Sequence, residues 1–181
     1  SNQELTTSEI YLISLNDQSK GSIIGKIPIS GEVWSGTYLH NDMVFIATLS
    51  GMLYVFDAKK IKDFSNNSFD EILIDSIQLP HAINSKLHFS SNNIFLSDVS
   101  GEFYSLNINN LQDNKKVNIK NWMISSPLFY LDKVYVFTVN GNVFLIDVEK
   151  HEILESFSTD KIIVGDPKKL QIDSDNYILI P

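Results

Sequence analysis

A segment that occurs three times constrains the fold of this chain more than any other feature. The three copies read MVFIATLSGMLYVFDAKK (43–60), NIFLSDVSGEFYSLNINN (93–110) and KVYVFTVNGNVFLIDVEK (133–150). In each copy two apolar stretches alternate with a period of two residues, which is the period of a β-strand and not of a helix. A turn that ends in glycine joins the two stretches, and glycine is favoured where a tight hairpin needs a positive φ. Each copy therefore predicts a β-hairpin.

A short polar side chain stands six residues after each turn glycine. These residues are Asp57, Asn107 and Asp147. Side chains of Asn and Asp accept hydrogen bonds from the backbone two residues further on and so close the end of a strand. We therefore expect an Asx-type turn at the end of each hairpin.

Further strands flank the hairpins on both sides. The upstream strands are expected at 33–42, 83–92 and 124–133, and the downstream strands at 71–79, 115–121 and 152–158. The turn glycines Gly51, Gly101 and Gly141 lie 50 and then 40 residues apart. Four antiparallel strands that recur every ~40–45 residues are typical of a β-propeller blade. The sequence thus predicts an all-β propeller with blades at 33–79, 83–121 and 124–158.

The two ends of the chain complement each other in the phase of the repeat. Residues 162–181 supply two strands, and residues 8–30 supply the two strands that would follow them. A fourth blade shared by the two termini would pair sheet edges that are otherwise free. We therefore expect a single domain, 1–181, that closes as a four-bladed propeller. The alternative is a fragment of a seven- or eight-bladed propeller.

The repeat resembles that of the PQQ-like propeller family, with a consensus close to "v.ssPvv.dg.vyvgs.dG.lyalda.tG". Residues 124–150, ISSPLFYLDKVYVFTVNGNVFLIDVEK, follow it almost position by position. The proline of the consensus is replaced by Thr37 and Lys86 in the first two blades and is kept as Pro167 in the split one. The family includes quinoprotein dehydrogenases, BamB-like scaffolds of bacterial outer-membrane protein assembly, and sensor or accessory domains of larger proteins.

Composition argues against several kinds of function. The 181 residues hold 14 basic side chains, all of them lysine, against 22 acidic ones, which gives a net charge of −8. A chain this acidic and without arginine does not suit a nucleic-acid surface. There is no cysteine, so thiolate catalysis and cysteine-held metals are excluded. The chain is also too short for the eight blades of a quinoprotein dehydrogenase, and it lacks the vicinal cysteines and the arginine found in many of those enzymes.

No motif in the sequence points to catalysis or to a bound metal. The chain has neither a nucleophile elbow nor a phosphate-binding loop. The four histidines, His40, His81, His88 and His151, are scattered without ligand spacing. Residues 173–176 start like a calcium loop, but a strand follows at once, so an Asx-rich turn is expected there instead. We therefore expect a protein that is not an enzyme and that holds no cofactor or metal.

One loop departs from the repeat length. Residues 58–71 account for the longer first spacing and carry the candidate partner-binding residues Lys59, Lys60, Lys62, Phe64 and Phe69. Long loops on rigid scaffolds often bind partners, and aromatic anchors beside charges suit an interface. The alternative is an insertion whose phenylalanines pack back onto the edge of the blade.

The sequence therefore predicts a monomeric, non-enzymatic scaffold that binds protein partners, BamB-like in its repeat. The alternatives are a sensor or regulatory propeller from a larger multidomain protein and, less favoured, a quinoprotein-type oxidoreductase. No apolar run reaches the ~20 residues of a membrane helix, and the N-terminus lacks the core of a signal peptide. The resemblance is compatible with a periplasmic or other extracytoplasmic location after removal of a targeting segment, and the residues themselves leave the compartment open.

Deleting residues 1–20 tests the shared fourth blade. If residues 8–30 complete a blade with 162–181, the truncated chain should fail to fold in soluble form, because the shared blade loses one of the two strands that residues 8–30 supply. Soluble yield and circular dichroism measure this. A truncated chain that is as soluble and as folded as the full one would contradict closure by the termini.

Overall fold

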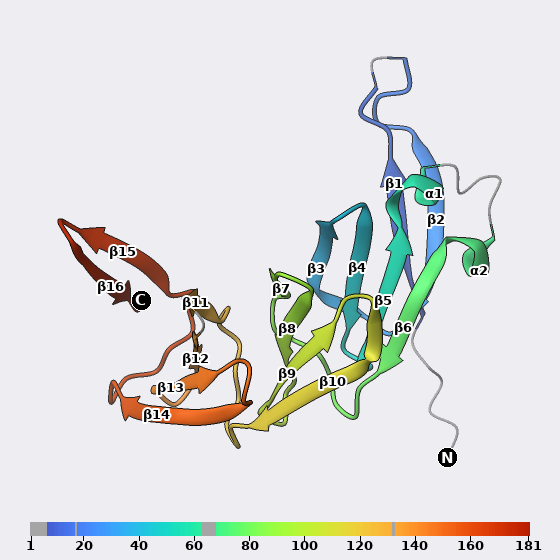
Figure 1. The fold of residues 1–181 in the computed structure, drawn as a ribbon. Helices are drawn as coiled ribbons and strands as arrows, with labels where there is room; N and C mark the ends of the chain where they lie inside the picture. The colour runs from blue at the N-terminus through green and yellow to red at the C-terminus, as the bar shows by residue number, and fades with distance from the viewer. Residues whose placement is uncertain (1–6, 17, 63–67, 132) are drawn as a thin grey trace. The chain divides into compact units, whose positions relative to one another are not determined.

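The computed structural model describes residues 7–16, 18–62, 68–131 and 133–181 (Figure 1). The chain divides into two compact units, residues 1–82 and 83–181, and each is described by itself. Both units consist of antiparallel β-sheets, and the described helices are two short ones in the first unit. The prediction of an all-β chain is confirmed.

The first unit contains one two-stranded and one four-stranded sheet. The two-stranded sheet pairs β1 (Thr7–Ile13) with β2 (Ile23–Ser30). The four-stranded sheet has the order β3-β4-β5-β6, with β3 (Val33–His40), β4 (Met43–Thr48), β5 (Met52–Asp57) and β6 (Leu73–Gln78). Two helices, α1 (Ala58–Ile61) and α2 (Phe69–Ile72), follow β5 and precede β6 along the chain (Figure 1).

The two sheets of the first unit pack against each other through apolar side chains. Ile27 and Ile29 of β2 meet Ile46, Tyr54 and Phe56 of the four-stranded sheet, and all five side chains are buried. Burial of each such side chain contributes ~1.5–3 kcal/mol. A two-stranded sheet is marginal alone, so this contact is what stabilises β1 and β2.

The second unit contains two four-stranded sheets and one two-stranded sheet. The first has the order β7-β8-β9-β10, with β7 (His88–Ser90), β8 (Asn93–Ser97), β9 (Glu102–Asn107) and β10 (Asn110–Asn118). The next has the order β11-β12-β13-β14, with β11 (Leu128–Tyr130), β12 (Lys133–Phe137), β13 (Asn142–Asp147) and β14 (Glu152–Ser158). The last pairs β15 (Lys168–Ile172) with β16 (Asp175–Leu179).

These sheets also stack face to face. Phe95, Phe103 and Val117 of the first sheet pack against Val134 and Val136 of the next. On its other face, the sheet β11–β14 contacts the last sheet: Leu128, Phe137 and Val143 form a cluster with Ile163, and Ile178 and Ile180 pack against that cluster. Each sheet of this unit therefore buries apolar side chains only together with its neighbour.

The predicted four-stranded sheets are thus confirmed, in the predicted strand order. In the second and third four-stranded sheets the first strand is shorter than expected. β7 and β11 cover only a part near the end of 83–92 and 124–133. In the sheet β7–β10, the side chain of Ser85 makes hydrogen bonds where the backbone pairing expected before β7 is absent. Ser85 Oγ donates to Ser97 O at 3.0 Å and accepts from Ser97 N at 2.7 Å. The strands expected in 8–30 and 162–181 form two separate two-stranded sheets, and their union in one blade stays a prediction.

The turns of the three hairpins have the structure that the sequence predicts. Gly51, Gly101 and Gly141 have φ values of 85°, 91° and 88°. Asp57, Asn107 and Asp147 each accept hydrogen bonds through Oδ1 from backbone N–H groups two residues on, at 2.8–3.0 Å. The predicted Asx-type turns are confirmed.

The same turns contain a second set of hydrogen bonds, which the sequence did not predict. Three residues before each glycine stands Thr48, Asp98 or Thr138, and its side chain accepts from the backbone N–H of the residue after the glycine at 3.0–3.1 Å. Asp98 is fully buried and also accepts from Ser100 N, Ser100 Oγ and the Tyr104 hydroxyl. Burial is the main reason that the pKa of Tyr104 is raised, and Asp98 adds to it.

Substituting Gly101 tests how strongly the turn depends on glycine. A Cβ at Gly101 would lie 2.6 Å from Asn121 N, whereas a Cβ at Gly36, whose φ is also positive, meets nothing within 4 Å. We expect Gly101→Ala to lower the free energy of unfolding by about 3 kcal/mol, from strain and overpacking together. The control Gly36→Ala should cost only about 1 kcal/mol. Equal losses in chemical denaturation would contradict the close approach at Gly101.

In the second unit, an ion pair joins the segments that precede β7 and β15. Lys86 Nζ donates to Asp166 Oδ2, and the backbone N–H of Ser126 donates to Asp166 Oδ1 at 2.9 Å. Burial alone would raise the pKa of Asp166, but the hydrogen bonds from Lys86 and Ser126 outweigh it and lower the pKa to about 2. The folded state therefore favours the ionised carboxylate.

This ion pair predicts a specific dependence of stability on pH. Because the pKa of Asp166 is lower in the folded state, its stabilisation is present above the unfolded pKa of ~3.9 and is lost as the pH falls toward 2. The Lys86 side chain is 56% exposed, so screening limits the effect to on the order of 1 kcal/mol. Asp166→Asn should lower the free energy of unfolding at pH 6 by this amount and much less at pH 2.5. The same loss at both values would contradict the assignment.

Candidate functional site

The insertion between β5 and β6 is an ordered part of the first unit wherever it is described. Asp57 caps α1 by accepting from Lys59 N and Lys60 N, and Ser68 and Glu71 form a capping box at α2. Ile61 and Ile72 are buried in the same core as the strands of the sheet. Hydrogen bonds from Ser68 are the main reason that the pKa of Glu71 is lowered.

Phe69 packs into this core. Its ring stands edge-on to the rings of Tyr54 and Phe56, with centroid distances of 6.3 and 5.6 Å. These contacts agree with the alternative that the phenylalanines pack onto the blade, and Phe69 is partly buried against the core. Phe64 lies outside the described residues. A contact between either ring and a partner stays a prediction.

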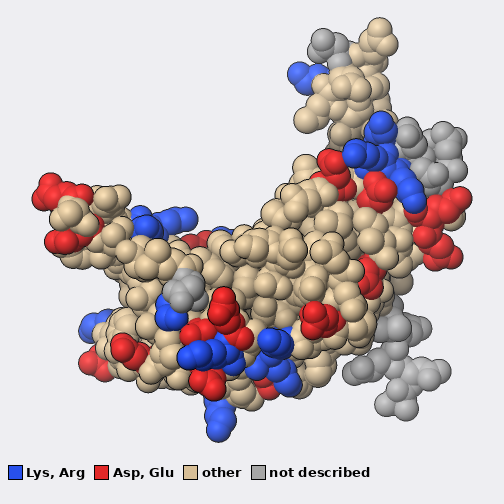
Figure 2. Space-filling view, in the orientation of Figure 1, with Lys and Arg blue, Asp and Glu red and all other residues tan. Residues whose placement is uncertain are grey.

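The three candidate lysines differ in their contacts. Lys59 Nζ forms an ion pair with Asp42 at 2.7 Å, and this hydrogen bond raises the pKa of Lys59. Lys60 Nζ donates to Glu71 O at 3.0 Å. Lys62 follows α1 and is exposed. Figure 2 shows acidic side chains among the basic ones where α1 and α2 lie, so the surface is mixed in charge and not purely basic.

The four histidines belong to different elements or connections of the fold. His88 stacks on Phe129 with a centroid distance of 4.1 Å, and burial lowers its pKa. His151 lies in the turn between β13 and β14. Residues 173–176 contain the tight turn between β15 and β16. Within the described part of the chain, no group of three or more His, Asp or Glu residues is placed to hold a metal ion. No helix there is long and apolar enough to cross a membrane.

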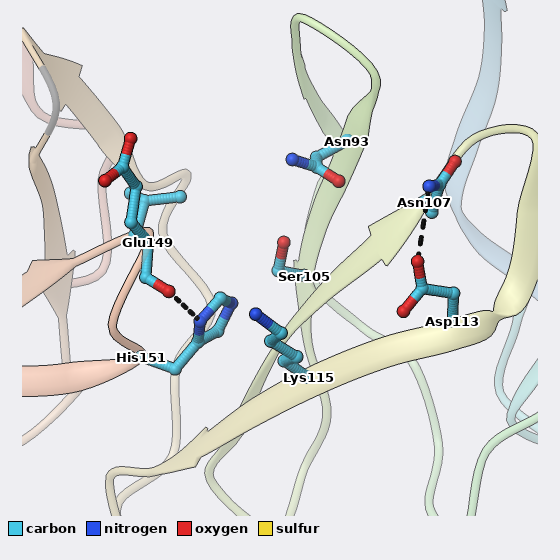
Figure 3. Close-up of a pocket in the computed structure, with 8 residues that line it drawn as sticks. Asn93, Ser105, Asn107, Asp113, Lys115, Glu149 and His151 are labelled. Atoms are coloured by element: carbon cyan, nitrogen blue, oxygen red, sulfur yellow. Dashed lines mark hydrogen bonds between the residues drawn. The ribbon is translucent and has the colours of Figure 1, made fainter.

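A polar pocket lies in the second unit, between the sheet β7–β10 and the turn that joins β13 to β14 (Figure 3). Its volume is about 310 Å³. The main polar side chains that line it are those of Asn93, Ser105, Asn107, Asp113, Lys115 and His151. The strand pairing explains their common face, because Asn93 lies opposite Asn107 and Ser105 lies opposite Lys115.

The pocket was not predicted from the sequence, although the repeat contains a signal for it. Ser105 stands four residues after the turn glycine, where the other two copies have Val55 and Leu145. A small polar side chain at a position that is otherwise apolar and large leaves space and an unmatched hydroxyl. A position where a repeat breaks its own pattern is a candidate for function.

Comparisons with known proteins agree with the fold. No family model matches the chain. The uncharacterized protein RP232 of Rickettsia prowazekii (strain Madrid E) is 28% identical over 76 residues, which are 42% of this chain and 18% of that protein. The crystal structure of BamB from Moraxella catarrhalis is similar over 99% of this chain and 56% of its own, with a TM-score of 0.66 and 17% identity.

Two further solved structures are similar. BBS1N, solved in complex with ARL6DN, matches 94% of this chain and 54% of its own at a TM-score of 0.63 and 10% identity. The computationally designed Ika4 protein matches 83% of this chain and 91% of its own at a TM-score of 0.60 and 10% identity. The chain thus spans about half the length of the BamB and BBS1N chains. Its four-stranded sheets are β-propeller-like blades.

Proposed function

We propose that this protein is a non-enzymatic scaffold that binds protein partners, BamB-like in outer-membrane protein assembly. The observation that carries the proposal is the construction of the insertion at 58–71. Its two described helices are held by caps and by the buried side chains of Ile61 and Ile72, so they present a preformed surface. A preformed surface binds with less loss of conformational entropy than a flexible loop. The likeness to BBS1N, which was solved with a bound protein, supports the same class of function.

The chemistry of this surface indicates how a partner would be recognised. Phe69 is partly buried against the core, and the exposed side chains of the insertion include Lys59, Lys60 and Lys62. Charges at the rim of an interface set orientation and the rate of association more than affinity. The partner would therefore carry acidic groups that face these lysines.

Charge reversal tests the proposal. Lys59, Lys60 and Lys62 are replaced together by Glu, and the matched control replaces Lys161, Lys168 and Lys169 of the second unit by Glu. Proteins captured from lysate of the native organism are quantified by mass spectrometry. We expect one or more proteins to be captured equally by the wild type and the control and about tenfold less by the first variant.

Two outcomes would contradict the proposal. One is capture that both variants lower equally, because the insertion would then have no special role. The other is the absence of any protein enriched above bare resin. Thermal midpoints of both variants are measured alongside, since a shared loss of folding would mimic a lost interaction.

This chain matches only part of the length of the proteins that it resembles. That observation favours a second candidate function, a sensor or regulatory propeller within a larger protein. The segment matches only 18% of the Rickettsia protein and about half of BamB and BBS1N. An antibody against this segment measures the length of the intact protein in native cells. A band much longer than 181 residues favours this candidate, and a band of that length argues against it.

A further inference from the structure

The side chain of Ser105 is 8% exposed and its hydroxyl has no hydrogen-bond partner among the residues that the structure describes. Its Oγ is not one of the buried side-chain atoms that lack a partner, so the oxygen is accessible from the pocket, whereas the other two copies have the apolar residues Val55 and Leu145 at this position. The hydroxyl points into the pocket (Figure 3). A ligand in the pocket would supply the missing partner.

Other unmatched polar groups line the same space. Neither the amide of Asn93 nor the ammonium group of Lys115 has a hydrogen bond to a described residue, and the Nε2 atom of His151 is buried without a partner. His151 Nδ1 lies 3.1 Å from Glu149 O. A carbonyl oxygen can only accept, so Nδ1 is the donor of this hydrogen bond, and in that tautomer Nε2 is an acceptor. The pocket therefore combines hydrogen-bond donors with acceptors.

The pocket is lined by charged groups of both signs, one lysine and the two acidic residues Asp113 and Glu149. Lys115 brings one positive charge, and Asp113, which accepts from Asn107 Nδ2 at 3.4 Å, brings one negative charge. Figure 3 shows the carboxylate of Glu149 turned away from Ser105 and Lys115. A small anion would meet Asp113 and a small cation would meet Lys115, so neither is favoured. Hydroxyl groups both donate and accept, and they match a mixed set of this kind.

We propose that this pocket binds a small neutral polyhydroxylated ligand of the saccharide class. Ser105, Asn93 and Lys115 donate to its oxygens, and His151 Nε2 and Asp113 accept from its hydroxyl groups. The volume of about 310 Å³ lies within the usual size of small-molecule sites, at the lower end. The pocket shares no residue with the insertion at 58–71, so the ligand proposal and the scaffold proposal are tested independently.

Titration calorimetry with free monosaccharides tests the proposal directly. The probes are glucose, galactose, mannose and N-acetylglucosamine, with acetate, phosphate and glycine as charged comparisons. We expect saturable binding of at least one monosaccharide with a Kd below about 10 mM and no binding of the charged probes. No saturable binding of any monosaccharide, or binding of acetate, phosphate or glycine instead, would overturn it.

Three variants locate the binding. Ser105→Val and Lys115→Met should each weaken the monosaccharide by at least about tenfold, because each removes a donor from the pocket. The control Lys116→Met changes the next residue of β10, which pairs with Glu102 at 3.3 Å and does not line the pocket. It should bind as the wild type does.

Thermal midpoints separate a binding role from a structural one. Ser105→Val restores the apolar side chain of the repeat, so we expect its midpoint without ligand to equal or exceed that of the wild type. Loss of binding in a variant that is at least as stable supports the proposal. Wild-type affinity in both pocket variants would overturn it.

Discussion

Stacking of one sheet face on the next is the interaction on which the rest of this structure depends. None of the sheets that the structure describes is large enough to bury its own apolar side chains, and each buries them against a neighbouring sheet. In the second unit Phe95 and Val117 meet Val134 and Val136, and Leu128 and Phe137 meet Ile163. In the first unit Ile27 and Ile29 hold β1 and β2 against the four-stranded sheet. The tight turns matter because they fix which face of each strand is available for this contact.

Regular stacking also explains where function can arise. Positions that follow the repeat are used for packing, so a partner or ligand site needs positions that depart from it. The chain departs from the repeat most clearly in the insertion at 58–71 and at Ser105. The insertion adds a preformed outer surface, while Ser105 opens space between two sheets that otherwise meet through apolar side chains.

Periodicity was enough to predict the hairpins, the glycine turns and the Asx closures, because each of them depends on residues close in sequence. The position of Phe69 could not be predicted in this way, since its contacts with Tyr54 and Phe56 form only when the sheet is assembled. The link from Lys86 to Asp166 spans 80 residues and leaves no local signal. The pocket at Ser105 could have been predicted from the sequence, because the other two copies of the repeat have the apolar residues Val55 and Leu145 at this position.

Hydrogen exchange followed by mass spectrometry tests the stacked-sheet account most directly. The central strands β4–β5, β8–β9 and β12–β13 are largely buried, so their amides should exchange slowest. Peptides from 43–57, 93–107 and 133–147 should therefore stay protected after the turns and the exposed strand β14 have exchanged. Exchange of the central hairpins as fast as β14 would contradict the claim that face-to-face stacking holds this fold together.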